Sequence, residues 1–183
     1  HFEGLAYFFV MFIVLWSGKL SNDLFTSYSI DNELTGRDNK ALAVSYVGYL
    51  MAQGIIVLEI LQGPEASSLV IDLGLIVLWS LIGILLLNLS RYINDKLILS
   101  KFSNRKEIID DKIIGMGVVQ FGSYIGTAFI LKAIIAGESE GLFSDLCGTV
   151  IFFMVGQLGF LVVSIIYQKI TVYDLHDQIE KDN

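Results

Sequence analysis

The chain has 183 residues, of which 54% are hydrophobic and 17% are charged, and its formal net charge is −7. Soluble domains have about 45–50% apolar and about 25% charged residues, so this composition excludes an ordinary soluble domain. The apolar residues also form uncharged blocks, and about 20 such residues make a helix that crosses a bilayer. The four longest uncharged blocks are Ala41–Leu58, Leu73–Ser90, Ile113–Leu131 and Leu146–Gln168.

The first expected helix is shorter than the others. Gly4–Gly18 has 15 uncharged residues before Lys19, and neither a basic leader nor the cleavage site of a signal peptide accompanies it. We interpret it as the remaining part of a transmembrane helix whose beginning is missing. The helices expected after it are Ala41–Leu61, Leu69–Ile93, Ile113–Ala136 and Leu142–Tyr167. The predicted fold class is therefore an all-α integral membrane protein with five transmembrane helices.

The segments between these helices differ in charge, and this difference predicts their orientation. Eleven of the 12 Lys and Arg residues lie in or beside residues 21–40, 94–112 and 168–183. Because Lys and Arg are retained on the cytoplasmic side, we expect these two loops and the tail to be cytoplasmic. The opposite side has a net charge of −6, from Glu3, Glu59, Glu65, Asp72, Glu138, Glu140 and Asp145 against Lys132. Such a rim attracts cations, although acidic residues are also simply free to be translocated.

Two parts of the chain resemble one another. When the sequence is aligned with itself at a shift of 73 positions, Asp72 matches Asp145, Gly83 matches Gly156 and Lys96 matches Lys169. At a shift one position larger, Gly48 matches Gly122 and Ala52 matches Gly126. We therefore expect two parallel helix-pair repeats of about 73 residues, at 21–93 and 94–167. Residues 1–20 would then end a preceding repeat and residues 168–183 would open a further one, so the chain is expected to be incomplete at both ends.

Two charged residues are expected inside the predicted helices. Glu59 and Lys132 lie at corresponding depths, about 6 Å from the outer helix ends. One interpretation is an intramembrane pair that locks the repeats together or gates a path. The other is that each side chain extends separately to the interface.

Asp72 and Asp145 lie in the first turns of their helices. A carboxylate there can satisfy the unpaired backbone N–H groups of the helix, and capping is the simpler interpretation. The alternative is a ring of carboxylates, one from each repeat, that binds a cation at the outer mouth.

Small and polar residues inside the helices predict close packing. Small residues spaced by four positions allow helices to approach one another, and the candidates are Gly48, Ala52, Gly122, Gly126, Gly83 and Gly156. The polar residues near the helix centres are Gln53, Asn88, Gln120 and Gln157. They either form hydrogen bonds between helices or line a polar pathway.

The loops and the helices that flank them carry a family resemblance. "YQKIT" followed by "YDLHDQIEKDN", and the segment Asn22–Ile55 with Glu33, Asn39 and Gly48 at matching places, resemble the bacterial inner-membrane family of domain of unknown function 350. The loop at residues 94–112 departs from the pattern, because it has Asp111-Lys112 where Asp-Asn is expected. The resemblance implies tandem two-helix units in a bacterial inner membrane, and it implies no particular activity.

No catalytic motif is recognisable in the sequence. We expect no enzyme activity, no cofactor, no bound metal and no nucleic-acid partner, but a lipid bilayer and either a second copy or another protein as partners. The first hypothesis is a structural or partner-binding component of an envelope assembly. The competing hypothesis is a cation or polyamine transporter or channel, supported by the acidic rim and by the corresponding Asp72 and Asp145.

Overall fold

The computed structural model describes residues 2–64, 66–98, 106–137, 139 and 141–170. The described residues form five long helices, α1 (Phe2–Phe25), α2 (Lys40–Leu61), α3 (Leu69–Ile93), α4 (Ile114–Ile135) and α5 (Leu142–Ile170). All five are long and apolar enough to cross a membrane. The predicted all-α membrane fold is therefore confirmed.

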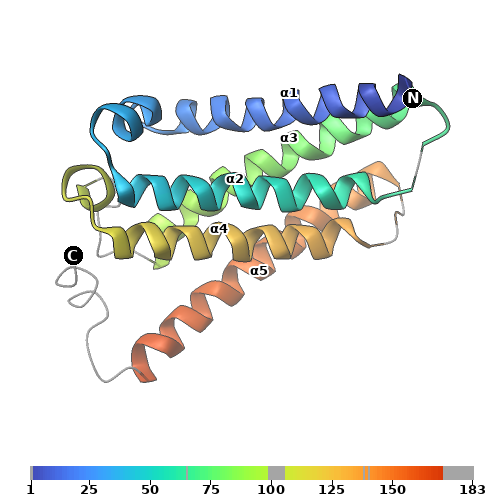
Figure 1. The fold of residues 1–183 in the computed structure, drawn as a ribbon. Coiled ribbons are helices and arrows are strands. Elements are labelled where there is room, and N and C mark those ends of the chain that lie inside the picture. The colour runs from blue at the N-terminus through green and yellow to red at the C-terminus, as the bar shows by residue number, and fades with distance from the viewer. Residues whose placement is uncertain (1, 65, 99–105, 138, 140, 171–183) are drawn as a thin grey trace.

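The connections between the helices differ at the two ends of the bundle (Figure 1). At one end, which we call the loop end, lie residues 26–39, 94–98 and 106–113, with the short π-helical turns η1 (Asn32–Gly36), η2 (Asn94–Ile98) and η3 (Lys106–Asp110). At the other, the turn end, residues 62–68 join α2 to α3 and residues 136–141 join α4 to α5. The loop end is thus the end at which the basic residues gather.

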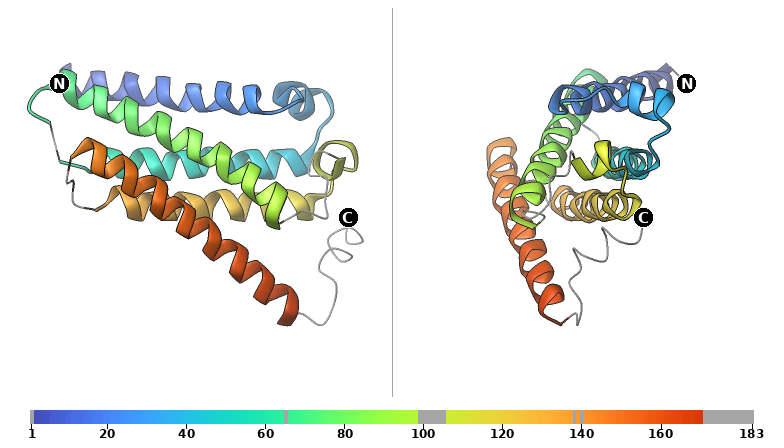
Figure 2. Two further views of the ribbon diagram at one scale, coloured as in Figure 1. Left: turned by 180° about the vertical axis from the view of Figure 1, so that it is seen from behind. Right: turned by 90° about the vertical axis from the view of Figure 1, so that its left-hand side faces the viewer.

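α2 and α4 run parallel and share the most extensive helix–helix contact in the molecule (Figure 1). Two glycines permit this approach. A Cβ added at Gly117 would lie 2.3 Å from the carbonyl oxygen of Ala41, and one added at Gly48 would lie 2.7 Å from the Cα of Phe121. α3 and α5 cross this pair obliquely from behind, and α1 packs against α3 and α2 (Figure 2).

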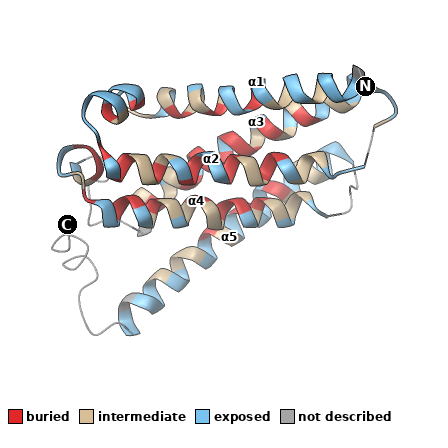
Figure 3. Cartoon of the chain, viewed as in Figure 1, coloured by how far each residue is buried: buried red, intermediate tan, exposed pale blue. Residues whose placement is uncertain are grey.

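The buried core lies where α2, α3 and α4 meet (Figure 3). Its centre is the fully buried Tyr49 of α2, whose ring packs edge-on against that of Tyr124 with centroids 5.4 Å apart. Large apolar side chains remain exposed along α1 and α5, among them Phe8, Phe12 and Phe152, at about three-fifths of their surface. An apolar exterior of this extent is suited to contact with lipid tails.

The first helix is longer than the sequence predicted. Expected to end at Gly18, α1 continues to Phe25, so the predicted boundary between residues 20 and 21 lies inside a helix. Lys19 does not end the helix because lysine is a good helix former. Its Nζ reaches Asp31, at 2.9 Å from one carboxylate oxygen and 3.0 Å from the other. Most of the predicted 168–183 tail lies outside the described residues, and α5 extends to Ile170.

The segments that lead into α2 and α4 have the same backbone geometry at corresponding positions. η1 corresponds to η3, and Asp38 and Lys112 both have positive φ angles, of 48° and 55°. Asn39 N donates to Glu33 O at 3.1 Å, and at the corresponding positions Ile113 N donates to Glu107 O at 2.8 Å. Each loop therefore turns into its helix through a tight π-turn followed by one left-handed residue.

Candidate functional site

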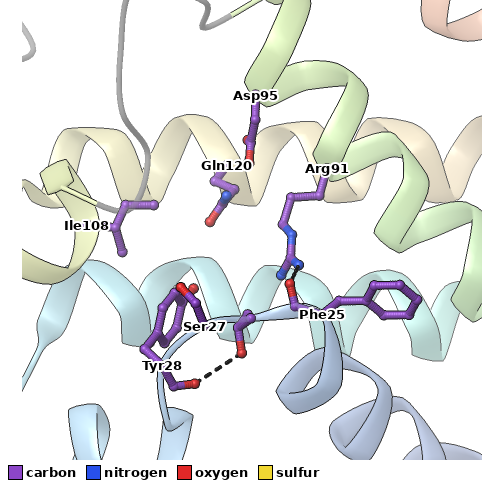
Figure 4. Close-up of a pocket in the computed structure, with 8 residues that line it drawn as sticks. Phe25, Ser27, Tyr28, Arg91, Asp95, Ile108 and Gln120 are labelled. Atoms are coloured by element: carbon purple, nitrogen blue, oxygen red, sulfur yellow. Dashed lines mark hydrogen bonds between the residues drawn. The ribbon is translucent and has the colours of Figure 1, made fainter.

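A cavity of about 160 Å³ opens at the loop end, between the α1–α2 connection, the end of α3, η3 and α4 (Figure 4). Polar side chains from segments far apart in the sequence meet around it. The lining residues are Phe25, Thr26, Ser27, Tyr28, Arg91, Asp95, Ile108 and Gln120.

Arg91 is the cation of this cavity, and it joins the last turn of α3 to the end of α1. Its guanidinium donates to the side-chain oxygen of Asn22 at 2.8 Å and to the carbonyl oxygen of Phe25 at 2.8 Å. The last carbonyl groups of a helix have no partner within the helix, so the guanidinium satisfies one at the end of α1. Asp95 lies close enough to interact with the same charge.

Tyr28 closes the cavity from the α1–α2 connection (Figure 4). Burial raises the pKa of its hydroxyl above the usual value, and the neighbouring Arg91 opposes this rise. The hydroxyl therefore stays neutral at physiological pH, and it offers the cavity a hydrogen-bonding group without a second charge.

Asn39 holds the two loops of the loop end together. Its side-chain oxygen accepts from Leu42 N at 3.0 Å and caps α2, while its amide nitrogen donates to Ile108 O in η3 at 2.8 Å. Lys112 Nζ donates to Arg37 O at 2.6 Å, which adds a second bond between the loops. An apolar cluster beneath these bonds contains Ala41, Leu42, Ile108, Ile109, Ile113 and Met116. Residues 26–39 and 106–113 thus form one packed surface, which we call the loop platform.

Polar side chains in the helix interiors bond across helix interfaces. Gln53 of α2 donates to Val14 O of α1 at 2.9 Å, and Asn88 of α3 donates to the Tyr49 hydroxyl at 3.2 Å. The four polar residues named from the sequence all take part in such bonds, since Gln120 accepts from Ser45 and Gln157 accepts from Ser90. These bonds pair polar groups with one another at buried positions, where an unpaired polar group is costly.

Glu59 and Lys132 lie together at the turn end, across the α2–α4 interface. Lys132 Nζ is 3.1 Å from a carboxylate oxygen of Glu59, and the side chains of Lys132 and Glu59 are 44% and 13% exposed. The sequence predicts that Glu59 and Lys132 lie at corresponding depths, and the packing of α2 on α4 brings these two side chains into contact.

Asp72 and Asp145 have different partners. Asp72 accepts from the Tyr7 hydroxyl of α1 at 2.6 Å and from Ala66 N at 3.0 Å, while Ser68 is the N-cap of α3. Asp145 accepts from the Ser139 hydroxyl at 2.6 Å. Asp72 also borders a cavity of about 200 Å³ together with Tyr7 and Pro64. The structure thus brings Asp72 to α1 and Asp145 to the α4–α5 connection.

Five of the six small residues named from the sequence lie in helix contacts. Ile56 of α2 packs on Gly83 of α3, and at corresponding positions Ile130 of α4 packs on Gly156 of α5. Gly48 packs on Phe121, Gly126 packs on Phe160, and Ala52 is fully buried. Gly122 differs, because a Cβ added there would meet no atom within 4 Å in the described part of the chain.

Sequence reasoning missed the loop-end cavity as a site. The sequence pattern assigns Arg91 only to the positive charge beside residues 94–112, and it gives no particular role to Tyr28. One signal was available, because Arg91 directly follows the uncharged block Leu73–Ser90 and so belongs to the last turn of a membrane helix. Intramembrane or membrane-edge charges of this kind are functional candidates by default.

Comparisons with known proteins bear on the family. The sequence model of the family described as Domain of Unknown Function (DUF350) matches residues 2–135, which is well over half of the chain. Searches of curated proteins and of solved structures gave no match. Within the described residues, no group of three or more His, Cys, Asp or Glu side chains is placed to hold a metal ion. With its five membrane-length helices and the matched residues 2–135, the chain belongs to the family described as Domain of Unknown Function (DUF350).

Proposed function

We propose that this chain is a non-enzymatic component of a bacterial inner-membrane assembly, and that the loop platform is a cytoplasmic surface for a protein partner. The observation that carries the proposal is the joining of the two loops by Asn39 and Lys112. A binding surface made of ordered segments loses little conformational entropy on association, which favours affinity.

The charges on the platform suit a protein partner of mixed charge. Lys106 and Asp31 have side chains 67% and 68% exposed, and Asp111 is 44% exposed. Exposed charges of both signs on a fixed backbone favour specific orientation of a partner more than general attraction to one sign of charge. The excess of Lys and Arg at the loop end supports a cytoplasmic location.

The polar residues of the helix interiors also support a structural role. Gln53, Asn88 and Gln157 are engaged in bonds that tie helices together. Such bonds are typically worth about 1 kcal/mol or less each in membranes, and together they fix the arrangement of the bundle.

The test combines a flux assay with site-specific photocross-linking. In proteoliposomes we expect no spermidine or potassium flux above that of empty vesicles. In cells, a photoreactive residue in place of the exposed Asp110 should give a discrete adduct with one protein, identified by mass spectrometry. The matched control is the same residue in place of Val163, which is 63% exposed on α5 and should give no such adduct. A flux together with no adduct at position 110 would contradict the proposal.

The second candidate is a transporter or channel for a cation or polyamine. It is favoured by the cavity of about 200 Å³ beside Asp72, whose carboxylate is oriented by Tyr7. If this carboxylate binds the substrate, the combined Asp72→Asn and Asp145→Asn substitutions should abolish the flux. A flux that survives both substitutions would remove the acidic residues from the pathway.

A further inference from the structure

The cavity at the loop end has one cation and one anion in its lining, and both come from the same end of α3. Arg91 lies in the last turn of α3, and Asp95 follows it by four positions in η2. The other lining residues are neutral at physiological pH, so the formal charges of the lining sum to zero. A ligand with a single charge would be attracted by one of these side chains and repelled by the other. The lining therefore favours a ligand that carries both charges or none.

Gln120 of α4 gives the cavity a hydrogen-bond donor that has no acceptor. Its side chain lines the cavity, although the residue as a whole is only 8% exposed. Its Oε1 accepts from Ser45, while its Nε2 makes no hydrogen bond within the described part of the chain. A buried donor without an acceptor is costly, and an anionic oxygen placed in the cavity would remove this cost. Between the two kinds of ligand, Gln120 thus favours the one that carries charges.

Arg91 can donate to the same anionic group. A guanidinium has five N–H donors in a planar fork that matches the oxygens of a carboxylate or a phosphate. The bonds to Asn22 and to the carbonyl oxygen of Phe25 use two of these donors. Arg91, Asp95 and Gln120 lie around the same space (Figure 4). Arg91 and Gln120 therefore form an anion-binding side of the cavity, and Asp95 offers an acceptor to a cationic group.

The walls of the cavity are held by hydrogen bonds of their own, and its volume limits the ligand. Thr26 Oγ1 donates to Tyr28 O at 3.1 Å, and Asn39 donates to Ile108 O at 2.8 Å. Walls that are already ordered lose little entropy when a ligand binds. The cavity of about 160 Å³ is close in size to one of about 150 Å³ that holds a benzene molecule. It therefore suits a ligand of about six to eight non-hydrogen atoms.

We propose that the loop-end cavity binds a small zwitterion, with its phosphate or carboxylate group on Arg91 and Gln120 and its primary ammonium group on Asp95. Two sources carry this chemistry at the required size. One is a free amino acid or amino alcohol phosphate, and the other is the phosphoethanolamine headgroup of a membrane lipid. Arg91 ends a membrane helix and Phe25 beside it is 56% exposed, so the cavity lies at the membrane edge, within reach of both sources. This site goes beyond the proposed function and does not depend on the partner of the loop platform.

Isothermal titration calorimetry of the full chain in phosphatidylglycerol nanodiscs tests the need for both charges. O-phosphoethanolamine is the zwitterionic probe, while ethyl phosphate has only its anion and ethylamine only its cation. After subtraction of empty nanodiscs, O-phosphoethanolamine should bind about tenfold more tightly than either of the others. Equal affinity for ethyl phosphate and O-phosphoethanolamine would overturn the proposal. So would the absence of binding by any probe, in protein that native mass spectrometry shows to be free of phosphatidylethanolamine.

Asp95→Asn should change the affinities for two of these probes in opposite directions. It removes the charge that holds the ammonium group, so the affinity for O-phosphoethanolamine should fall about tenfold. It also removes the charge that repels an anion, so the affinity for ethyl phosphate should rise, which a misfolded variant would not show. Asp110→Asn is the matched control, because Asp110 is exposed in η3 and does not line the cavity. An unchanged affinity of Asp95→Asn for O-phosphoethanolamine would overturn the proposal.

Nanodiscs that contain phosphatidylethanolamine distinguish the two sources. If the headgroup of this lipid is the ligand, it occupies the cavity, and added O-phosphoethanolamine should no longer bind. If the ligand is a soluble zwitterion, O-phosphoethanolamine should bind equally well in both kinds of nanodisc. Both results support the zwitterion site and assign the source of its ligand, whatever the flux and photocross-linking results are.

Discussion

α2 and α4 each have 22 residues and follow equivalent turns, yet their surroundings differ. Half of the most apolar 18-residue stretch of α2 is buried inside the molecule. In the most apolar 18-residue stretch of α4, the buried share is 28%. Each helix packs against three others, α2 against α1, α3 and α4, and α4 against α2, α3 and α5. The comparison teaches that an equal number of neighbouring helices does not give equal burial, because corresponding residues such as Gly48 and Gly122 face different surroundings.

The beginnings of the two helices also differ in chemistry. Asn39 caps α2 with its side chain, whereas Ile113 at the corresponding position of α4 makes no such bond and instead lies buried in the apolar cluster of the loop platform. One position in corresponding turns is therefore stabilised by hydrogen bonds in α2 and by apolar burial in α4.

The largest expected effect breaks the contact between the two helices. Gly117→Ala places a Cβ 2.3 Å from the backbone oxygen of Ala41, and since backbone cannot move aside as a side chain can, α2 and α4 must separate. We expect a loss of about 3 kcal/mol in the free energy of unfolding, at the upper end of the usual cost of overpacking. The measurement is unfolding of the monomer in detergent by titration with a denaturing surfactant.

The control for this prediction is the same substitution on the exposed face of α4. Gly122→Ala meets no atom within 4 Å in the described structure and replaces glycine with a better helix former. We expect the monomer to be unchanged or stabilised by up to about 1 kcal/mol. Equal losses for the two variants would mean that the α2–α4 contact is looser than described.

The next effect concerns the cap that α2 has and α4 lacks. Asn39→Ala removes the bonds to Leu42 N and Ile108 O and should cost about 2–3 kcal/mol, as a lost N-cap and a lost buried hydrogen bond together. Asn39→Ser keeps an acceptor for Leu42 N, so it should recover about half of this loss. If both variants are equally unstable, the bond to Ile108 carries the whole effect.

A smaller effect is expected at the turn end, where α2 and α4 share one ion pair. Lys132 is 44% exposed, so the coupling between Glu59 and Lys132 should be about 1 kcal/mol or less. A double-mutant cycle with Glu59→Gln and Lys132→Met, followed by unfolding of the monomer, measures this coupling. A measured coupling energy several times larger than about 1 kcal/mol would mean that water does not reach the pair.

The smallest expected effect is a pH dependence of the free energy of unfolding caused by Tyr28, which precedes α2 in the chain. Burial raises the pKa of Tyr28 in the folded chain, so the unfolded chain ionises first, near pH 10. The contribution of Tyr28 to the stability of the folded chain is therefore complete below about pH 10. It is lost as the pH rises toward the pKa that Tyr28 has in the folded chain. Tyr28→Phe should show a shallower decline of stability between about pH 9 and 11. The corresponding position ahead of α4 is Phe102, which has no hydroxyl to ionise.

Much of the fold was predictable because the membrane restricts the possible structures. An uncharged block of the length of Leu73–Ser90 satisfies its backbone in lipid by forming a helix, so the existence of α3 follows from the sequence. The end of α1 does not follow from the sequence, because a charged residue at position 19 does not decide whether the helix continues, and the bond between Lys19 and Asp31 depends on how the next segment folds back. The loop-end cavity was missed for a similar reason, since Arg91 and Tyr28 lie far apart in the sequence and meet only in the folded chain.

By itself, the sequence determined that this protein has membrane-length helices and that glycines and polar residues recur along them. It also determined that the charge of the connecting segments differs between the loop end and the turn end of the bundle. Composition and spacing are sufficient for these features, because they reflect the solvent around each segment and the periodicity of a helix. Only the tertiary structure decided that Gly48 is enclosed while Gly122 is open, and that Asp72 meets Tyr7. The physical reason is that contact depends on which helix lies beside a given face, and corresponding residues have different neighbours at different places in the bundle.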